Sequence, residues 1–136
     1  GRLEMNRFIA KHGLTAYQRN PYFPVNTVQI MRGAVLMGRR GRLLEYVDAV
    51  YGNMWEQGLK MDDPKVIAAA LDDTGFDGAG ILDGIQEQSV KDELLTNTNA
   101  SVERGTFGSP TFFVGDEIFF GKDRLDGVEA EIEKRK

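Results

Sequence analysis

Apolar residues recur at helical spacing over most of the chain, three or four positions apart. Each such stripe predicts one face of an amphipathic helix. The stripes cover residues 1–12, 27–36, 43–55, 66–71, 90–102 and 125–132. A brief helix over 81–85 is also expected, although nearby glycines each cost it up to about 1 kcal/mol. The pattern therefore predicts a chain that is largely helical.

Residues that commonly begin and end helices support these assignments. Gly13 follows the first stripe and suits the left-handed position that ends many helices. Asp63 followed by Pro64 matches an N-cap with proline at the first helical position. Ser89 is expected to cap the helix that carries the next stripe, and Gly105 is expected to end it.

Two other parts of the chain depart from helical spacing. The stretch 20–26 contains two prolines, which exclude a helix and predict an ordered loop. Residues 111–114 and 118–120 are rich in β-branched and aromatic side chains, and the glycine and aspartate between them favour a turn. This pattern predicts a β-hairpin with Pro110 at its entrance.

Composition narrows the chemistry that the chain could perform. None of its 136 residues is cysteine, which excludes disulfides, thiolate metal sites and a cysteine nucleophile. The one histidine, His12, lies where a cation complements a helix C-terminus, so no metal site is expected. The net charge of −4 disfavours nucleic acid as a partner. No apolar run reaches the roughly 20 residues that span a bilayer, and no signal-peptide pattern is seen, so a cytoplasmic protein without membrane contact is expected.

Two segments near the C-terminus carry a distinctive signature. Residues 107–117 (FGSPTFFVGDE) and 120–125 (FGKDRL) closely resemble the C-terminal signature of the 2-hydroxychromene-2-carboxylate isomerases. Residues 23–27 and 97–105 also resemble the helical region of this family. The family belongs to the thioredoxin-like superfamily, together with the kappa-class glutathione transferases and the disulfide oxidoreductase DsbA.

The resemblance implies an α/β, thioredoxin-like fold of the DsbA and 2-hydroxychromene-2-carboxylate isomerase type, present here in incomplete form. Residues 1–104 would form a large helical domain, and residues 105–136 the second half of a thioredoxin-like domain, a hairpin with a terminal helix. Family members carry their catalytic serine at an earlier junction between a strand and a helix. The only Ser-Pro dipeptide here, Ser109-Pro110, matches a different position. No catalytic residue is therefore assigned, and the chain alone is expected to lack the nucleophile.

Pro110 is the first candidate for ligand binding. From the sequence alone an ordinary trans proline entering a strand is expected, since only about 5–6% of X-Pro bonds are cis. The resemblance implies a cis bond instead, with the backbone N–H and C=O of Ser109 exposed. Those two groups would pair in β-fashion with the peptide-like backbone of glutathione.

The segment 121–124 is the second candidate, because it joins the predicted hairpin to the terminal helix, where backbone N–H groups favour an anion. The resemblance implies that Asp123 accepts hydrogen bonds from the α-ammonium of glutathione, while N–H groups receive the α-carboxylate. Alternatively, Asp123 caps the terminal helix, and the two roles are compatible. The side chain of Lys122 is expected to be exposed. The whole glutathione site implied by the resemblance comprises Ser109, Pro110, Phe120, Gly121, Lys122 and Asp123.

Asn26 is the third candidate, at the end of the predicted loop. The resemblance implies that it faces a cleft between the helical domain and the thioredoxin part, where its amide would hydrogen-bond a substrate carboxylate or hydroxyl. Capping of the next helix is an equally open alternative. Four apolar residues could line an aromatic substrate pocket, but their helical spacing favours core packing. They are Met31, Tyr51, Met54 and Trp55.

Two functions from different classes follow. The resemblance implies a glutathione-dependent isomerase of an aromatic 2-hydroxychromene-2-carboxylate, or a related glutathione transferase, with glutathione and an aromatic carboxylate as its partners. The alternative is a non-catalytic small-molecule-binding or oligomerisation module derived from this family. A hairpin with an open edge would leave apolar side chains uncovered, so a homodimer with strand or domain exchange is expected. The uncovered residues would be Phe112, Phe113, Phe119 and Phe120.

Overall fold

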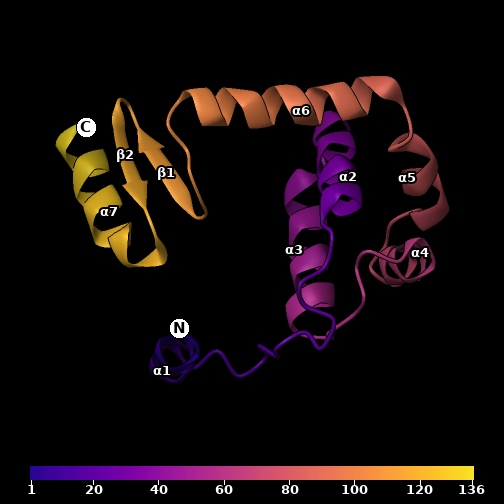
Figure 1. The fold of residues 1–136 in the computed structure, drawn as a ribbon, viewed down its shortest axis with the longest axis horizontal. Helices are drawn as coiled ribbons and strands as arrows, with labels where there is room; N and C mark the ends of the chain where they lie inside the picture. The colour runs from indigo at the N-terminus through magenta and orange to yellow at the C-terminus, as the bar shows by residue number, and fades with distance from the viewer. The chain divides into compact units, whose positions relative to one another are not determined.

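The computed structural model describes all of residues 1–136 and divides the chain into two compact units, Gly1–Leu94 and Leu95–Lys136. Figure 1 shows the mostly helical path of the chain, which confirms the prediction from apolar spacing. The helices are α1 (Arg2–His12), α2 (Val28–Arg39), α3 (Leu43–Trp55), α4 (Pro64–Asp73), α5 (Gly78–Gly84), α6 (Gln88–Glu103) and α7 (Leu125–Lys134). The other elements are β1 (Thr111–Val114), β2 (Glu117–Phe120) and a short 3-10 helix, η1 (Lys122–Arg124). None of the helices is both long enough and apolar enough to cross a membrane.

Most of the residues expected to begin and end helices do so. Gly13 ends α1 in the left-handed conformation with a φ of 62°, and the Asp63 carboxylate caps α4 by accepting a backbone N–H. Gly105 follows the end of α6 with a φ of 107°. The prediction for Ser89 is wrong, because α6 begins at Gln88 and Ser89 lies inside its first turn.

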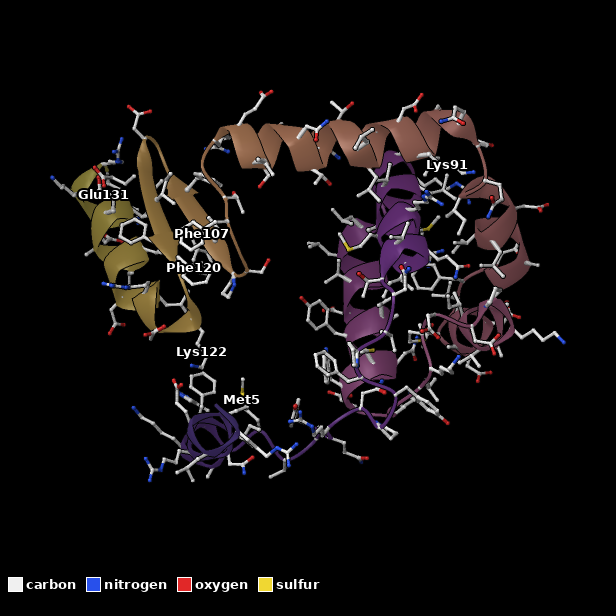
Figure 2. The ribbon with its side chains drawn as sticks, in the orientation of Figure 1. Met5, Lys91, Phe107, Phe120, Lys122 and Glu131 are labelled. Carbon is white, nitrogen blue, oxygen red and sulfur yellow. The ribbon has the colours of Figure 1, made fainter.

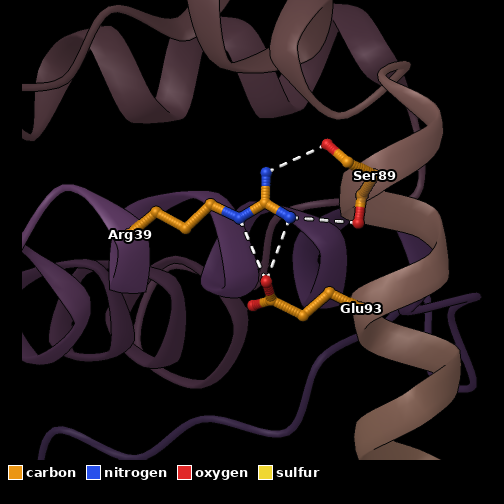
Figure 3. Close-up of polar contacts among 3 residues, drawn as sticks. All are labelled: Arg39, Ser89 and Glu93. Carbon is orange, nitrogen blue, oxygen red and sulfur yellow. Dashed lines mark hydrogen bonds and ion pairs between the residues drawn. The ribbon is translucent and has the colours of Figure 1, made fainter.

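Arg39, the last residue of α2, gives Ser89 a different role. Its Nη1 donates to the Ser89 hydroxyl at 3.1 Å, and its Nη2 donates to the Ser89 carbonyl at 3.0 Å (Figure 3). Its Nε and Nη2 also donate to Oε1 of Glu93, at 3.1 and 3.0 Å. The guanidinium therefore ties the end of α2 to the beginning of α6.

Helix α5 is longer than the segment 81–85 predicted for it. Its first residue is Gly78, and the Asp77 carboxylate caps it by accepting the N–H of Gly80 at 3.0 Å. A Cβ at Gly78 would overlap the backbone of α4, and one at Gly84 would overlap a leucine side chain of α2. The glycines that lower the helix propensity of α5 thus allow it to approach two neighbouring helices.

The core of the first unit lies among α2, α3, α4 and α5. Tyr46 in α3 is 2% exposed, and its hydroxyl donates to the carbonyl of Ile30 in α2 at 2.6 Å. Gly33 leaves room for that ring, because a Cβ there would overlap the tyrosine hydroxyl. Burial raises the pKa of Tyr46 well above its ordinary value. The other apolar residues at the centre of the core include Leu36, Met37, Met61, Ile67, Leu71, Ile81, Ile85 and Val90.

The loop after α1 is held against the end of α3 by a buried amide. Asn20 is 2% exposed, and its Nδ2 donates to the carbonyls of Met54 at 2.9 Å and Leu59 at 2.8 Å. Its Oδ1 accepts the N–H of Tyr22 at 2.7 Å. One side chain therefore forms hydrogen bonds with the C-terminal end of α3, with the segment that follows α3 and with the loop itself. This confirms the expectation of an ordered loop over 20–26.

The second unit is built on the predicted hairpin. Strands β1 and β2 pair antiparallel, with Thr111 opposite Phe120 and Val114 opposite Glu117, and the turn places Gly115 at a φ of 60°. They form a sheet of two strands, so each strand has one edge that no other strand pairs with. Helix α7 packs closely on the hairpin. A Cβ at Gly127 of α7 would lie 3.1 Å from the ring of Phe119 in β2.

The apolar side chains of the hairpin are covered more fully than expected. Phe112, Phe113 and Phe119 are half-buried, and the guanidinium of Arg104 lies 3.8 Å from the centre of the Phe113 ring. The prediction that all four phenylalanines are uncovered is therefore wrong for three of them, because α7 packs on the hairpin and Arg104, just after α6, covers the Phe113 ring. Only Phe120 is exposed among the four. Two further apolar residues of this unit, Phe107 and Ile118, are also exposed.

Candidate functional site

The hairpin register gathers the six predicted glutathione-binding residues at one end of the second unit. Thr111 pairs with Phe120, and the N–H of Gly121 donates to the carbonyl of Pro110 at 3.0 Å, which continues the ladder by one step. Ser109 and Pro110 therefore lie beside the segment that runs from β2 into α7. In Figure 2 the labelled Phe107 and Phe120 rings lie side by side at the hairpin, with a centroid separation of 4.6 Å.

Ser109 presents an unpaired backbone at this end of the hairpin. The Ser109–Pro110 peptide bond is cis, and both residues are exposed. The next residue, Thr111, donates its hydroxyl to the carbonyl of Gly108 at 2.6 Å, which fixes the turn around Ser109. Neither the N–H nor the C=O of Ser109 has a hydrogen-bond partner within the chain. Both backbone groups are therefore free to bind a ligand.

Asp123 lies on the neighbouring segment and does not cap the terminal helix. The N-cap of α7 is Arg124, and neither α7 nor η1 has a side-chain cap. The capping alternative for Asp123 is therefore wrong, because η1 intervenes and moves the helix start past it. The Asp123 carboxylate is exposed and has no hydrogen-bond or ion-pair partner within the chain. Gly121, with a φ of 101°, lets the backbone turn at this point, and a Cβ there would lie 2.8 Å from that carboxylate.

Lys122 departs from the expectation for its side chain. The residue is half-buried rather than exposed. It lies in η1, between Gly121, which follows β2, and Asp123.

Asn26 belongs to the first unit and has a local structural role. Its Oδ1 accepts the N–H of Val28 at 2.9 Å, which stabilises the first turn of α2 from one position before the N-cap, Thr27. The residue is exposed, and its Nδ2 makes no hydrogen bond within the chain. The structure therefore supports the helix-starting alternative and leaves the amide N–H groups available.

An apolar cleft of about 260 Å³ lies between the loop after α1, α2 and α3. Its volume is close to the lower end for small-molecule sites, about 300 Å³. All four residues that sequence spacing assigned to the core line this cleft. Met54 is buried and Trp55 packs half-buried against the core, but Met31 and Tyr51 are 48% and 65% exposed, so core packing is the wrong interpretation for these two. The lining residues also include Phe23, Val25, Thr27, Ile30, Ala34, Tyr46, Val47 and Val50.

Trp55 is the aromatic centre of this region. Its ring stacks on Tyr17, with centroids 5.9 Å apart and planes 22° apart, and it is tilted against Phe23 at 5.7 Å. The Tyr17 and Phe23 contacts were not predicted, because both residues come from a loop whose sequence has no periodicity to indicate which helix it covers.

The structure contains no group of three or more histidine, cysteine, aspartate or glutamate side chains placed to hold a metal ion. The groups that it places at the hairpin end are hydrogen-bond donors and acceptors, and those in the cleft are apolar and aromatic. The first set suits a peptide-like ligand with a charged end, and the second suits a planar apolar ligand.

The family model of the DSBA-like thioredoxin domain matches residues 4–133, which is nearly the whole chain. The chain belongs to this family. Membership confirms the resemblance on which the thioredoxin-like fold was predicted. A solved structure of selenomethionine 2-hydroxychromene-2-carboxylate isomerase has the same DsbA-like fold, with a TM-score of 0.77 and 24% sequence identity. That match covers 98% of this chain and 64% of the solved chain.

Several curated proteins related to this DSBA-like chain are named 2-hydroxychromene-2-carboxylate isomerase. The one from Pseudomonas sp. (strain C18) is 30% identical over 112 residues, which is 81% of this chain and 53% of the relative. The one from Sphingobium xenophagum is 31% identical over 87 residues, 64% of this chain and 45% of the relative. The one from Pseudomonas putida is 28% identical over 112 residues. The chain thus spans about half the length of the curated relatives it matches.

Proposed function

We propose that this chain forms part of a glutathione-dependent isomerase that acts on an aromatic substrate of the 2-hydroxychromene-2-carboxylate type. The names of its relatives support the reaction class, and the free polar groups at the hairpin end support the cofactor. The observation that carries the proposal is that the Ser109 backbone and the Asp123 carboxylate, which the hairpin register brings to one end, both lack partners within the chain.

These groups match the chemistry of glutathione. An extended peptide offers one N–H and one C=O on the same edge, and the Ser109 backbone would pair with both. The α-ammonium of the γ-glutamyl end would donate to the Asp123 carboxylate, and charge-assisted bonds of this kind are the strong ones. When bound, glutathione would supply a thiol as the nucleophile. The chain holds the ligand and orients it, and it carries no cysteine of its own.

The apolar cleft is the proposed place for the substrate's ring system. Aromatic ligands bind well in clefts lined by aromatic and aliphatic side chains, because both burial and ring contacts stabilise them. Trp55, Phe23 and Tyr51 supply three such rings here. The free amide N–H groups of Asn26, next to two of the lining residues in sequence, would donate to a substrate oxygen.

Calorimetric titration of the chain with reduced glutathione tests the cofactor part of the proposal. Saturable binding is expected, and Asp123→Asn is expected to weaken it by at least about tenfold, since one bond to a charged group contributes about 1.5–3 kcal/mol. Ser109→Ala should retain binding, because the proposed contacts are from its backbone. Asp116→Asn is the matched control: it removes the same charge from the exposed turn at the other end of the hairpin. Equal weakening by Asp116→Asn and Asp123→Asn would contradict a specific role for Asp123.

One observation favours the alternative of an oligomerisation module. Phe107, Ile118 and Phe120 are 78%, 43% and 43% exposed, and β1 has an edge that no strand pairs with. Exposed apolar residues beside an open strand edge favour pairing with another chain. Sedimentation across micromolar concentrations should then show a homodimer, and Phe107→Ser should shift it towards monomer. A parent chain that remains monomeric throughout would remove this alternative.

A further inference from the structure

A second cleft in the first unit has the opposite character to the apolar cleft. It measures about 390 Å³, and we call it the basic cleft because two arginines, Arg2 of α1 and Arg19 of the following loop, line it and no carboxylate does. Neither guanidinium has an ion-pair or hydrogen-bond partner within the chain. An unpaired arginine beside a cleft is a receptor for an anion, and its fork geometry matches a carboxylate.

The structure fixes Arg19 more firmly than an ordinary loop residue. The N–H of the preceding residue, Gln18, donates to the carbonyl of Trp55 at 2.6 Å. The following residue, Asn20, is buried and donates to the carbonyls of Met54 and Leu59. Both neighbours are thus bound to the end of α3 or the segment after it, and the backbone of Arg19 is held between them. A guanidinium attached to a fixed backbone loses less entropy when it binds an anion.

The basic cleft and the apolar cleft share two aromatic residues. Phe23 and Trp55 line both clefts, and their rings are 5.7 Å apart. The two clefts therefore adjoin at this aromatic pair. A planar apolar ring joined to an anionic group has the chemistry to fill both clefts.

We propose that Arg19 determines substrate specificity: its guanidinium binds the carboxylate of an aromatic acid, and the ring of that acid lies in the apolar cleft. This inference rests on the proposed function, because it assumes that the apolar cleft holds an aromatic ligand. It adds the residue that distinguishes an aromatic acid from its uncharged analogue.

The test compares chromone-2-carboxylate with chromone-2-carboxamide, which has the same ring system without the charge. Calorimetry on the full chain gives each dissociation constant, and the fluorescence of Trp55, the one tryptophan, reports whether the ligand reaches the shared aromatic pair. The carboxylate should bind more tightly, and Arg19→Gln should weaken it by about tenfold or more while leaving carboxamide binding unchanged. Arg19→Lys should lie between parent and Arg19→Gln. Arg40→Gln is the control, since it removes an exposed, unpaired arginine at the end of α2 and should change neither constant.

The outcomes separate this inference from the proposed function. If both probes bind equally well to the parent and to Arg19→Gln, the role of Arg19 is refuted while the aromatic cleft stands. If Arg40→Gln weakens carboxylate binding as much as Arg19→Gln does, general charge accounts for the effect and the inference is also refuted. If neither probe binds, the apolar cleft holds no aromatic ligand, and both the inference and the substrate part of the proposed function are refuted.

Discussion

Replacement of Asn20 by alanine is expected to be among the most destabilising changes to a polar residue in the first unit. The side chain is 2% exposed and makes hydrogen bonds to two carbonyls and one N–H. Asn20→Ala would leave the carbonyl of Met54 without a donor in a buried position and the carbonyl of Leu59 without one in a partly buried position. The exposed loop at Tyr22 can bond to water instead. The cost therefore comes mainly from the two carbonyls.

The magnitude follows from those two groups. A buried polar group left unsatisfied costs about 1–3 kcal/mol, and the partly buried carbonyl of Leu59 should cost about 1 kcal/mol, the lower end of that range. Together the two carbonyls should lower the free energy of unfolding of the first unit by about 2–4 kcal/mol. This is a large part of the about 5–15 kcal/mol typical of whole domains. With a urea slope of about 1.5 kcal/mol per molar, the midpoint should fall by about 1.3–2.7 M.

Urea unfolding followed by tryptophan fluorescence is the appropriate assay. The chain has one tryptophan, Trp55, which lies next to Met54 and reports the first unit. Asn26→Ala is the matched control, because Asn26 is exposed and makes one hydrogen bond at the start of α2. It should cost about 1 kcal/mol or less. A loss at Asn20 that is no larger than the loss at Asn26 would refute the assignment of Asn20 as the anchor of the loop.

Three further predictions concern the same unit. Gly33→Ala should lower the free energy of unfolding by about 1–3 kcal/mol, because the added methyl overlaps the Tyr46 hydroxyl. The double variant with Tyr46→Phe should lose less stability than the sum of the two single losses, and additive losses in urea unfolding would be inconsistent with this contact. Burial raises the pKa of Tyr46, so the stability that its protonated hydroxyl contributes is complete below about pH 10 and is lost above it, by up to about 1.4 kcal/mol per pH unit. The free energy of unfolding of Tyr46→Phe should therefore fall less steeply between pH 10 and 12 than that of the parent. An equally steep fall in both proteins would contradict burial as the cause. Arg39→Lys should lower the free energy of unfolding by about 1 kcal/mol, nearly as much as Arg39→Ala, since lysine cannot reproduce the forked contacts to Ser89 and Glu93. Full stability in Arg39→Lys would show that the positive charge alone is sufficient.

The elements that sequence reasoning located well are those set by local interactions. Asp63 caps the helix that follows it, Gly13 ends the helix before it, and the turn at Gly115 fixes the hairpin register. Each depends on residues within a few positions. The register in turn brings Ser109 and Asp123 to one end of the hairpin, although it was the family resemblance that grouped them as a candidate cofactor site.

Features that depend on distant residues were not predictable in the same way. Ser89 does not cap α6, because the helix begins one residue earlier, at Gln88. The partner of Ser89 is instead Arg39, fifty positions earlier, which donates to its hydroxyl and carbonyl. Helical spacing placed Met31 and Tyr51 on an apolar face, but it does not say whether another element covers that face, and here a cleft leaves both exposed. Arg19 lies in a loop without periodicity, so no pattern indicated that its neighbours are bound to the end of α3.

The most direct test of the central claim is to map reduced glutathione onto the backbone of the chain by amide chemical-shift perturbation in solution. The largest shifts are expected at the N–H groups of Ser109, Gly121 and Asp123, with little change at Asp116 in the opposite turn. Asp123→Asn should reduce all of these shifts at the same glutathione concentration. Shifts that are absent up to millimolar glutathione, or that are largest at the opposite turn, would contradict a glutathione site at this end of the hairpin.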